Sequence, residues 1–542
     1  MVFTIHRYIF REVFKVFILT VVALTLILSL GSVLRPVEEY GVGPRQVMHL
    51  MIYFLPVTLT FILPMSALFA TSLVYGRLAG DNELNACRAS GISLLTLIYP
   101  GAILSIIVAI ASLLLSFHVM PAFFKRAESA LKSDAKQILF RNIERTGYYE
   151  PPGTGSRIYA ERAVEESDSL FGVVIAEVEG SGIKRIVTAR RARVHFTEHE
   201  NFNEVHIKAY DTYQIGRVDE IGFSARSVLL SKQFPSLLGD DIKFKKIGEM
   251  KRISQEPIRF YPIEKNAQDV FAQLTTELLY QDIKGQMSSE AEGFYVLHSG
   301  DRLLELSAGQ CYPDKSEGQT LELQGDVRVR EFDLAIEGGS RQRRLLRRLH
   351  SDSAIVRLEG QSPMLTVTVE LRNPSWQRVD GGEGLAQRVI VRGLLVPDTV
   401  LQHFREADML SEVERSEVET ELNGEVSGRL NRLMSRLDKE IHDTIAEIKA
   451  EIHTRLVFGI GCIPMILIGI GLGIIKKGGH PLSAFGTSCV PAVVLVVCML
   501  MGKNLTKNPA AGELPGITLI WAGFGILTVL VFLIYHKLLR VR

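Results

Sequence analysis

A short polar segment between two apolar runs holds the residues best placed to do chemistry. The segment "YGRLAGDNELNACRASGIS" (75–93) contains two acids, two arginines and three glycines. Asp81 can cap the N-terminus of a helix, and Glu83 then lies in the first turn, where backbone amides favour an anion. Gly91 suits the left-handed position just after such a helix. The pattern predicts a helix of about ten residues over 80–91, which needs another surface to pack against because so short a helix is marginal in water.

The predicted helix can serve as a contact surface for a soluble protein. Leu84 and Cys87 lie three residues apart on one of its faces, and Arg88 adds a positive charge. The segment is therefore either a docking helix, which transmits a partner's movement into the two spans that it joins, or a loop that rests on lipid headgroups. Asp81, Glu83, Leu84, Cys87, Arg88 and Gly91 are the candidate residues for docking.

Other reactive groups form no recognisable catalytic or metal site in the sequence. The five cysteines make no CxxC pair, and no Cys/His cluster has the spacing of a zinc site. No GxxxxGK(S/T) loop occurs, so ATP-driven work requires an ATPase in another polypeptide, and we expect neither a metal nor a cofactor in this chain. The net charge of +1 gives no overall attraction to nucleic acid. A membrane-bound enzyme is disfavoured because no Ser/His/Asp set or carboxylate pair is apparent.

Six apolar runs flank and position the polar segment, and each is long enough to cross a bilayer as a helix. They are Val13–Leu34, Ile52–Val74, Leu94–Val119, Leu456–Ile475, Leu482–Gly502 and Ile517–Tyr535. The lysines and arginines next to the runs concentrate in the amino-terminal segment, in 75–93, at 476–477 and at the carboxyl end. With six spans these four flanks share one side, which the positive-inside rule places in the cytoplasm. The layout is three spans, a large external domain and three spans.

The polar middle of the chain reads mostly as β structure. Short runs rich in Val, Ile, Tyr and Phe recur at intervals of about ten residues, a pattern typical of an antiparallel sandwich or roll. We predict one β-rich domain over 121–400, with a second β module at about 290–395. Apolar residues at steps of three and four predict a long amphipathic helix over 401–455. That helix either packs on its own β domain or forms a coiled coil with a partner.

The apolar spans suit a lipid substrate better than an ion. They hold almost no ionisable groups, which argues against a proton relay. Arg35, which follows the first span, can bind two phosphate oxygens at once or simply anchor the helix at headgroup level. Lys15 is either a second contact or a side chain that reaches the interface. Gly469 and Gly473 permit close helix packing, within the chain or against a partner.

Several segments resemble one known family. "GRLAGDNELNACRASGIS" resembles the signature of the LptF/LptG-type permeases of lipopolysaccharide export. "HRYIFREVFKVF" is similar to that family's amino-terminal entry, and "EIHTRLVFGIGCIPMILIGIGLG" to its Glu-x-x-x-Arg entry into the fourth span. "KKGGHPLSAFG" and "PGITLIWAGFGILTVL" fit the fifth and sixth spans. The resemblance covers both membrane parts, 1–120 and 456–542, and about 110 residues after the third span.

The resemblance implies a membrane α-helical fold of six transmembrane helices with a large extracytoplasmic β-jellyroll-like domain and an amphipathic helical segment. It implies a permease subunit of an ATP-driven ABC transporter in the bacterial inner membrane. Such a permease pairs with a second LptF/LptG-like permease and binds a dimeric ATPase, which holds the ATP and Mg²⁺. Glu83 matches the acidic residue that the helix at 80–91 presents to the ATPase, and Arg35 matches a basic residue that touches lipid phosphates. The periplasmic domain passes lipopolysaccharide or a related glycolipid to an LptC/LptA-like β-jellyroll protein.

The chain also departs from the family pattern. The second β module and the long amphipathic helix come before the fourth span, where the family would have a short helix. "LELQGDVRVREFD" resembles the repeats of the periplasmic bridge proteins, so one hypothesis is a fused bridge-like module. An alternative function stays open: a non-transporting scaffold or signalling protein that couples a cytoplasmic ATPase to an extracytoplasmic effector.

Overall fold

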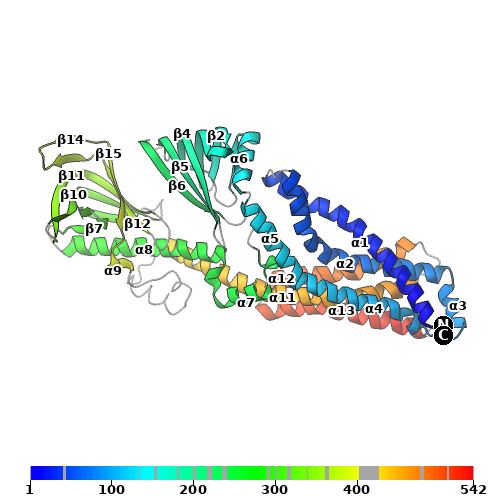
Figure 1. Ribbon diagram of the computed structural model, residues 1–542. Helices are drawn as coiled ribbons and strands as arrows, with labels where there is room; N and C mark the ends of the chain where they lie inside the picture. The colour runs from blue at the N-terminus through cyan, green and yellow to red at the C-terminus, as the bar shows by residue number, and fades with distance from the viewer. Residues whose placement is uncertain are drawn as a thin grey trace. The chain divides into compact units, whose positions relative to one another are not determined.

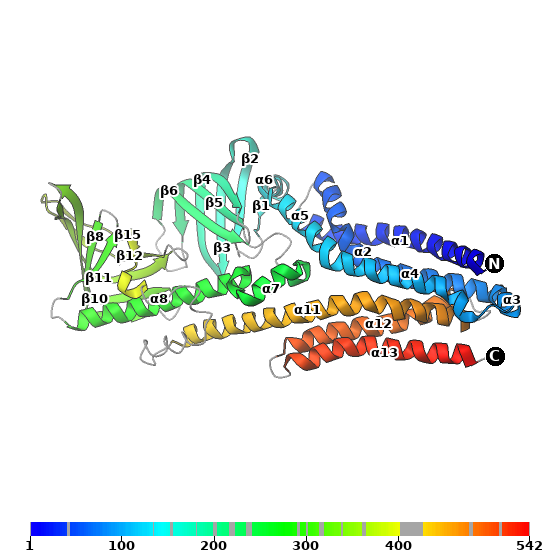
Figure 2. The same ribbon diagram turned by 60° about the horizontal axis from the view of Figure 1, so that its bottom comes forward.

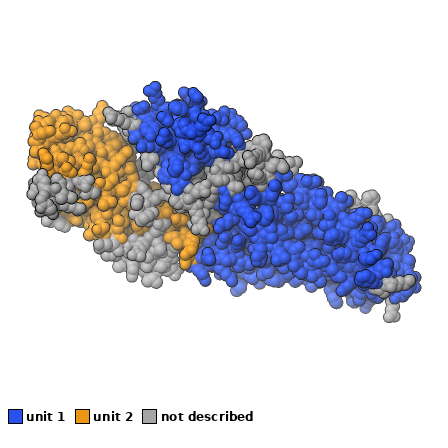
Figure 3. Space-filling model, viewed as in Figure 1, with its two compact units in different colours: residues 1–255, 442–542 blue, residues 256–441 orange. Residues whose placement is uncertain are grey.

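The fold was analysed in a computed structural model of the chain (Figure 1). The structure describes residues 2–40, 44–133, 135–151, 156–179, 182–198, 203–215, 223–234, 241–289, 293–299, 302–313, 319–337, 340–359, 365–401, 427–475, 481–508 and 512–540. The chain forms two compact units (Figure 3). Unit 1 comprises Met1–Gln255 and His442–Arg542, and unit 2 comprises Glu256–Ile441.

Unit 1 contains a bundle of long apolar helices. Its helices are α1 (Val2–Tyr40), α2 (Pro44–Gly80), α3 (Glu83–Ala89), α4 (Leu94–Leu114), α12 (Pro481–Thr506), α13 (Glu513–Arg540) and the part of α11 (Gly428–Ile475) that follows residue 441. Within the described residues, six segments can cross a membrane by length and composition. They are Phe3–Ser29, Met51–Gly80, Leu94–Ser129, Gly428–Ile475, Cys489–Thr506 and Glu513–Arg540. The expected arrangement of three membrane helices on each side of a β-rich region is confirmed.

The bundle is organised around α2 and α11. The apolar windows of these two helices are 56% and 67% buried, whereas that of α1 is only 17% buried. α12 and α13 run beside the apolar half of α11 (Figure 2), and Leu495 and Leu527 pack there against Ile468. The third span does not end as a plain α-helix. α4 passes through a π-helical turn, η1 (Leu115–Val119), into α5 (Met120–Ser133).

A six-stranded antiparallel sheet completes unit 1. Its strands are β1 (Tyr148–Tyr149), β2 (Ser156–Val164), β3 (Ser169–Glu179), β4 (Gly182–Glu198), β5 (Asn203–Ile215) and β6 (Phe223–Phe234), in sequential order. α6 (Ala135–Thr146) covers one face, because its Ile138 and Leu139 are buried in the same core as Leu170 and Ala192 of the sheet. The short turns η2 (Glu165–Ser167) and η3 (Ile242–Phe244) and the helix α7 (Ile247–Gln255) complete this part. This sheet is the first part of the β-rich region that the sequence predicts over 121–400, and no βαβ unit interrupts its described strands.

Unit 2 contains the second group of strands and the helix α8 (Tyr261–Ser289), which follows the turn η4 (Pro257–Arg259). The strands are β7 (Tyr295–Ser299), β8 (Arg302–Ser307), β9 (Gln310–Pro313), β10 (Thr320–Glu337), β11 (Ser340–Glu359), β12 (Thr366–Arg372), β13 (Ser375–Arg378), β14 (Glu383–Leu385) and β15 (Arg388–Leu395), and a short helix α9 (Asp398–Leu401) follows. The sheet order is β14-β13-β11-β12-β15-β7-β8-β10-β9. Because β10 also pairs with β11, six of these strands close into a ring.

The predicted amphipathic helix and the fourth span are one helix. Residues 402–426 lie outside the described residues, and α11 then runs without a break for 48 residues from Gly428 to Ile475. The predicted boundary between an amphipathic helix ending at 455 and a membrane helix starting at 456 does not exist in the backbone. Only the pattern of apolar and polar side chains changes there. Ser427 starts the helix: its Oγ accepts a hydrogen bond from Leu430 N (3.1 Å), and Glu277 of α8 accepts one from Ser427 N (3.2 Å). Leu430 and Leu437 of the predicted apolar stripe are buried, and Met434 rather than the predicted Leu433 is the buried residue between them.

Candidate functional site

The polar segment between the second and third spans forms the short helix α3, but its start differs from the prediction. Asp81 does not cap α3: its amide donates to Arg77 O (2.9 Å) and so still belongs to the end of α2. Asn82 occupies the cap position in a left-handed conformation (φ 61°) and makes no side-chain cap. Instead, Asn85 Nδ2 donates to Asn82 Oδ1 (2.8 Å). The chain therefore leaves α2 and enters α3 through a tight turn.

The carboxyl end of α3 follows the prediction. Gly91 has a left-handed backbone (φ 85°), and its amide donates to Arg88 O (3.0 Å). The next helix begins two residues later, where Ser93 Oγ accepts a hydrogen bond from Thr96 N (3.2 Å). α3 is thus fixed at both ends to the spans that it joins.

The candidate docking residues in and next to α3 differ in how far they are exposed. Leu84 is buried, and Cys87 packs against the same apolar cluster, so both face the chain's own bundle. Asp81 and Arg88 are exposed and Glu83 is half-buried, which leaves a charged side open to solvent. Glu83 Oε2 accepts a hydrogen bond from Tyr8 OH of α1 at 3.5 Å. Sequence reasoning missed this contact, because the two residues are 75 positions apart.

α3 shares its end of the bundle with both chain termini (Figure 1). We call this the α3 end. α1 begins there and α13 ends there, so the basic residues of these segments gather at one end. Arg77 of α2 also forms an ion pair with Glu12 of α1 at 3.2 Å. Lys476 and Lys477, which the sequence also assigns to this side, lie outside the described residues.

Tyr75 ties together the two spans on either side of α3. Its side chain is fully buried, and its hydroxyl donates to Leu97 O of α4 at 3.0 Å. The amide of Gly101, also in α4, donates to the same hydroxyl at 3.3 Å. A Cβ at Gly101 would lie 2.5 Å from Ile470 Cδ1 of α11 and 3.0 Å from the Tyr75 hydroxyl, so α4 packs closely against both side chains at this glycine. A force on α3 therefore acts on α2 and α4 together.

The two small residues of the fourth span pack within the chain. A Cβ added at Gly473 would lie 2.8 Å from the backbone oxygen of Ser72, and one at Gly469 would lie 3.2 Å from the backbone oxygen of Leu68. Both glycines therefore face α2, and the backbones of α2 and α11 approach closely. Of the two interpretations left by the sequence, the structure supports intrachain packing.

We expect Gly473→Val to destabilise the bundle by about 1–3 kcal/mol, which is the usual cost of overpacking a tight core. The reason is that the new side chain meets backbone atoms of α2, which cannot rotate away as a side chain could. Thermal unfolding in detergent, followed by helical circular dichroism, measures the effect. Gly525→Val on α13 is the matched control, because a Cβ there meets nothing within 4 Å. Equal melting temperatures for the two variants would contradict close α2–α11 packing.

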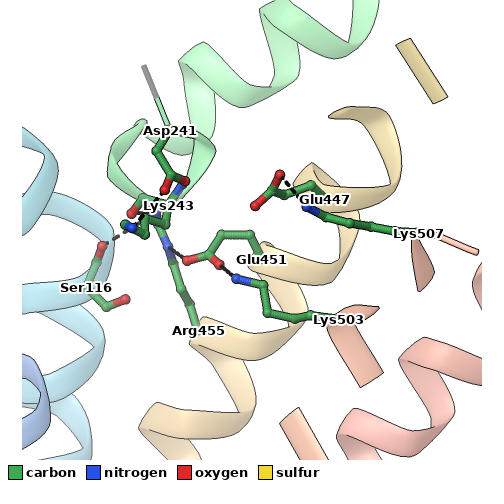
Figure 4. A network of polar contacts seen from close by, with 8 residues as sticks. All are labelled: Ser116, Asp241, Lys243, Glu447, Glu451, Arg455, Lys503 and Lys507. Atoms are coloured by element: carbon green, nitrogen blue, oxygen red, sulfur yellow. Dashed lines mark hydrogen bonds and ion pairs between the residues drawn. The ribbon is translucent and has the colours of Figure 1, made fainter. Parts of the chain in front are cut away.

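A buried ion pair joins α11 to α12 at the end of the bundle remote from α3 (Figure 4). Arg455 Nε donates to Glu451 Oε1 (3.0 Å), and Lys503 of α12 pairs with the other oxygen of Glu451. The guanidinium of Arg455 also donates to two backbone oxygens, Ser116 O of η1 (3.2 Å) and Lys243 O of η3 (2.8 Å). We call these five residues the junction network. It connects the third, fourth and fifth membrane helices with the segment that leaves the six-stranded sheet.

The π-helical turn has a clear place in this network. A π-helix shifts the backbone hydrogen bonds by one residue and is common at functional sites. Here the carbonyl of Ser116, inside η1, points to Arg455 (Figure 4). The Glu451-x-x-x-Arg455 spacing is the signal in the sequence, because residues four apart share a helix face. Its partners, however, come from distant parts of the chain.

Three further polar contacts, more exposed than the junction network, join α11 to the carboxyl end of α12 and to α13 at this level. Lys507 pairs with Glu447 (3.0 Å), and Lys449 pairs with Glu513 (2.7 Å). Trp521 Nε1 donates to His453 Nδ1 (3.2 Å), which places an aromatic ring at the same level. Tryptophan and lysine at this position are typical of a helix end at a membrane surface.

The two candidate lipid contacts lie far apart on α1. Lys15 is exposed in the first half of the helix, and Arg35 lies near its end, with a side chain outside the described residues. At a rise of about 1.5 Å per residue, the helix separates them by about 30 Å, roughly the thickness of a bilayer core. One headgroup cannot contact both side chains. No group of three or more His, Cys, Asp or Glu residues that could hold a metal occurs within the described parts of the chain.

Comparison with known proteins agrees with this geometry. The family model described as "Lipopolysaccharide export system permease LptF/LptG" matches residues 7–242 and 275–537. No curated protein matches the chain. The matched segments contain α3, the tight α2–α11 packing and the whole junction network except Lys243, and they make up most of the sequence. The chain belongs to the LptF/LptG family of lipopolysaccharide export system permeases.

Proposed function

We propose that this chain is a permease subunit of an ATP-driven ABC transporter that extracts lipopolysaccharide or a related glycolipid from the bacterial inner membrane. The observation that carries the proposal is the construction of α3. Leu84 fixes this helix to the bundle, while Glu83 stays half-exposed and Arg88 fully exposed to solvent. Such a helix suits a groove on a soluble partner that moves during its own cycle.

The proposed partner at the α3 end is a dimeric ABC-type ATPase. It would hold the ATP and Mg²⁺, since the sequence has no phosphate-binding loop of its own. Movement of the ATPase would press on α3, and the Tyr75 contacts with α4 would carry that movement into both adjoining spans. The α3 end would then lie in the cytoplasm, with the six-stranded sheet in the periplasm.

A second permease and the lipid would meet the apolar face of α1. Only 17% of the apolar window of α1 is buried by the chain itself. Leu19, Leu26 and Ile27 are each at least 65% exposed on it. Two permeases facing each other across such helices would enclose an apolar chamber for acyl chains. The β-jellyroll-like domain would then pass the lipid to an LptC/LptA-like β-jellyroll protein.

Within this proposal, Arg35 is the better phosphate contact. It follows the apolar part of α1 at the end remote from α3, where headgroups of the outer leaflet would lie. Its planar guanidinium can bind two phosphate oxygens at once. Lys15 lies in the half of α1 near the α3 end, so it would meet headgroups of the inner leaflet instead.

We expect Arg35→Glu to lower crosslinking of glycolipid to α1 by about tenfold, the size of effect for a lost charge-assisted contact of about 1.5 kcal/mol. A photoreactive amino acid at the exposed position Leu26 reports the lipid. Arg35→Lys keeps the positive charge but cannot bind two phosphate oxygens at once, so an intermediate crosslinking signal is expected. Equal crosslinking in all three proteins would remove Arg35 from the lipid path.

The direct test of the function is to purify the full chain in mild detergent and identify its bound lipids and co-eluting proteins by mass spectrometry. A phosphorylated glycolipid together with an ABC-type ATPase supports the proposal. An ATPase without any glycolipid favours the alternative, a scaffold that passes a conformational change across the membrane. If neither a glycolipid nor an ATPase is found, both the permease function and the scaffold function are contradicted.

A further inference from the structure

Unit 2 carries a groove that the proposed transport cycle does not use. It has a volume of about 650 Å³, within the range of small-molecule sites. Four strands form it: β10, β11, β13 and β14. We call it the β10–β14 groove. Its lining residues fall into three rows across these strands, because the strand registers place four residues directly opposite one another in each row.

The middle row shows which face of the sheet is open. It runs from Val329 through Leu349 and Trp376 to Gly384. Val329 and Leu349 are buried, so this row points toward the interior of the strand ring. Side chains of successive residues point to opposite faces of a sheet, so the other two rows point outward. All three rows line the groove, and the two outer rows carry its charged side chains.

The outer rows bring basic side chains together. In one row Arg330 lies directly across from Arg348, so two positive charges are opposite each other, and in the other Arg328 lies across from His350. Like charges at directly opposite positions destabilise a sheet. Three arginines and a histidine therefore meet on two neighbouring strands, at a cost that an anion in the groove would relieve.

Acidic neighbours compensate only part of this charge. Asp326 pairs with Arg328 and lies 3.1 Å from His350 Nδ1, and the hydrogen bond from Arg328 lowers the pKa of that carboxyl. Glu305 lies 3.8 Å from Arg330. Arg348 forms no ion pair with any of the residues that the structure describes. Arg348 is exposed and lines the groove.

The rest of the groove is suited to a sugar. Continuing the two rows, Ser375, Gln377 and Glu383 offer hydroxyl, amide and carboxylate groups, which match the hydrogen-bonding needs of sugar hydroxyls. Leu385 ends one row and is 84% exposed, so an apolar surface borders the polar one. This mixture of groups differs from a plain cation patch, for which an acidic protein would be the natural partner.

The hairpin that forms the far wall is held in place before any ligand arrives. The Trp376 ring covers Gly384 so closely that an added Cβ would lie 2.9 Å from it. Arg378 lies over the other part of this ring at 5.5 Å. A preformed wall lowers the entropic cost of binding.

We propose that the β10–β14 groove binds the phosphorylated saccharide part of a ligand, with Arg348 and its neighbouring arginines on the phosphate and β13–β14 on the sugar hydroxyls. The inference rests on the proposed function only for the supply of such a ligand, which a glycolipid headgroup would provide. A free sugar phosphate has the same chemistry and would fit the groove equally well.

The test is calorimetric titration of the full chain in detergent with four probes: a deacylated, phosphorylated glucosamine disaccharide, the same disaccharide without phosphate, inorganic phosphate, and an acidic peptide. We expect the phosphorylated disaccharide to bind most tightly and Arg348→Gln to weaken it by tenfold or more. Arg372→Gln is the matched control, since Arg372 is exposed on β12 of the same sheet and does not line the groove.

Each other outcome overturns the proposal. Equal affinity for inorganic phosphate shows a simple anion site, and tighter binding of the peptide shows a protein-binding patch. Binding of intact glycolipid without binding of the deacylated disaccharide places recognition elsewhere. Unchanged affinity in Arg348→Gln removes the groove from any binding seen. None of these results depends on ATPase co-purification, so a failure here is distinct from a failure of the permease function.

Discussion

Glu83→Lys in α3 should reduce the amount of ATPase that co-purifies with the chain by tenfold or more. Under the proposed function, Glu83 lies on the face of α3 that enters the ATPase groove. Reversing the charge there both removes an attraction and adds a repulsion, and interfacial changes of this kind cost about 2–5 kcal/mol. Glu83→Ala removes only the attraction, so its loss should be smaller. Quantitative mass spectrometry of the purified complex measures both variants.

The protein itself should stay folded in these variants. Glu83 is only half-buried, and its hydrogen bond from Tyr8 is long at 3.5 Å. Glu144→Lys is the matched control, because Glu144 is exposed on α6, outside the bundle. Undiminished co-purification in Glu83→Lys would exclude docking through this face of α3, whereas an equal loss in Glu144→Lys would indicate a nonspecific charge effect.

Arg455→Met should destabilise the membrane bundle by about 3–5 kcal/mol, the range for removing one partner of a buried ion pair. Arg455 is 4% exposed, and its loss leaves the Ser116 and Lys243 carbonyls without their donor. Glu451 keeps only Lys503 as a charge partner. The measurement is thermal unfolding of the purified chain in detergent.

The matched control for this variant is Lys449→Met, six residues earlier on the same helix. Lys449 pairs with Glu513 at 2.7 Å, but its side chain is 46% exposed, and exposed pairs contribute about 0–1 kcal/mol. The two variants remove the same charge from one helix. If both lower the melting temperature equally, the junction network contributes no more than a surface pair does.

The membrane helices could be predicted from the sequence because their signal is local. A run of about 20 apolar residues is sufficient to identify a span. The six predicted runs therefore correspond to the six apolar segments of the structure. The reliance on a local signal also explains one error. The side-chain pattern changes at Leu456, so the sequence predicts two separate helices where the structure has the single helix α11.

The candidate site was only partly predictable, because much of it depends on distant partners. Gly91 was identified, since a left-handed glycine after a helix is a local feature. Arg455, by contrast, bonds to carbonyl groups 339 and 212 positions away, and nothing near Ser116 or Lys243 marks those carbonyls in the sequence. Asp81 was misassigned because the length of the turn after α2 decides which residue precedes α3, and a single position changes the answer.

α11 is one continuous helix about 70 Å long, at about 1.5 Å per residue, and Pro464 lies within its membrane part. If its membrane part rolled by a single residue, about 100°, Gly473 would swing away from α2. The close backbone contact with α2 would then be lost in one step, so rotation of α11 about its own axis opens the bundle rather than adjusting it gradually.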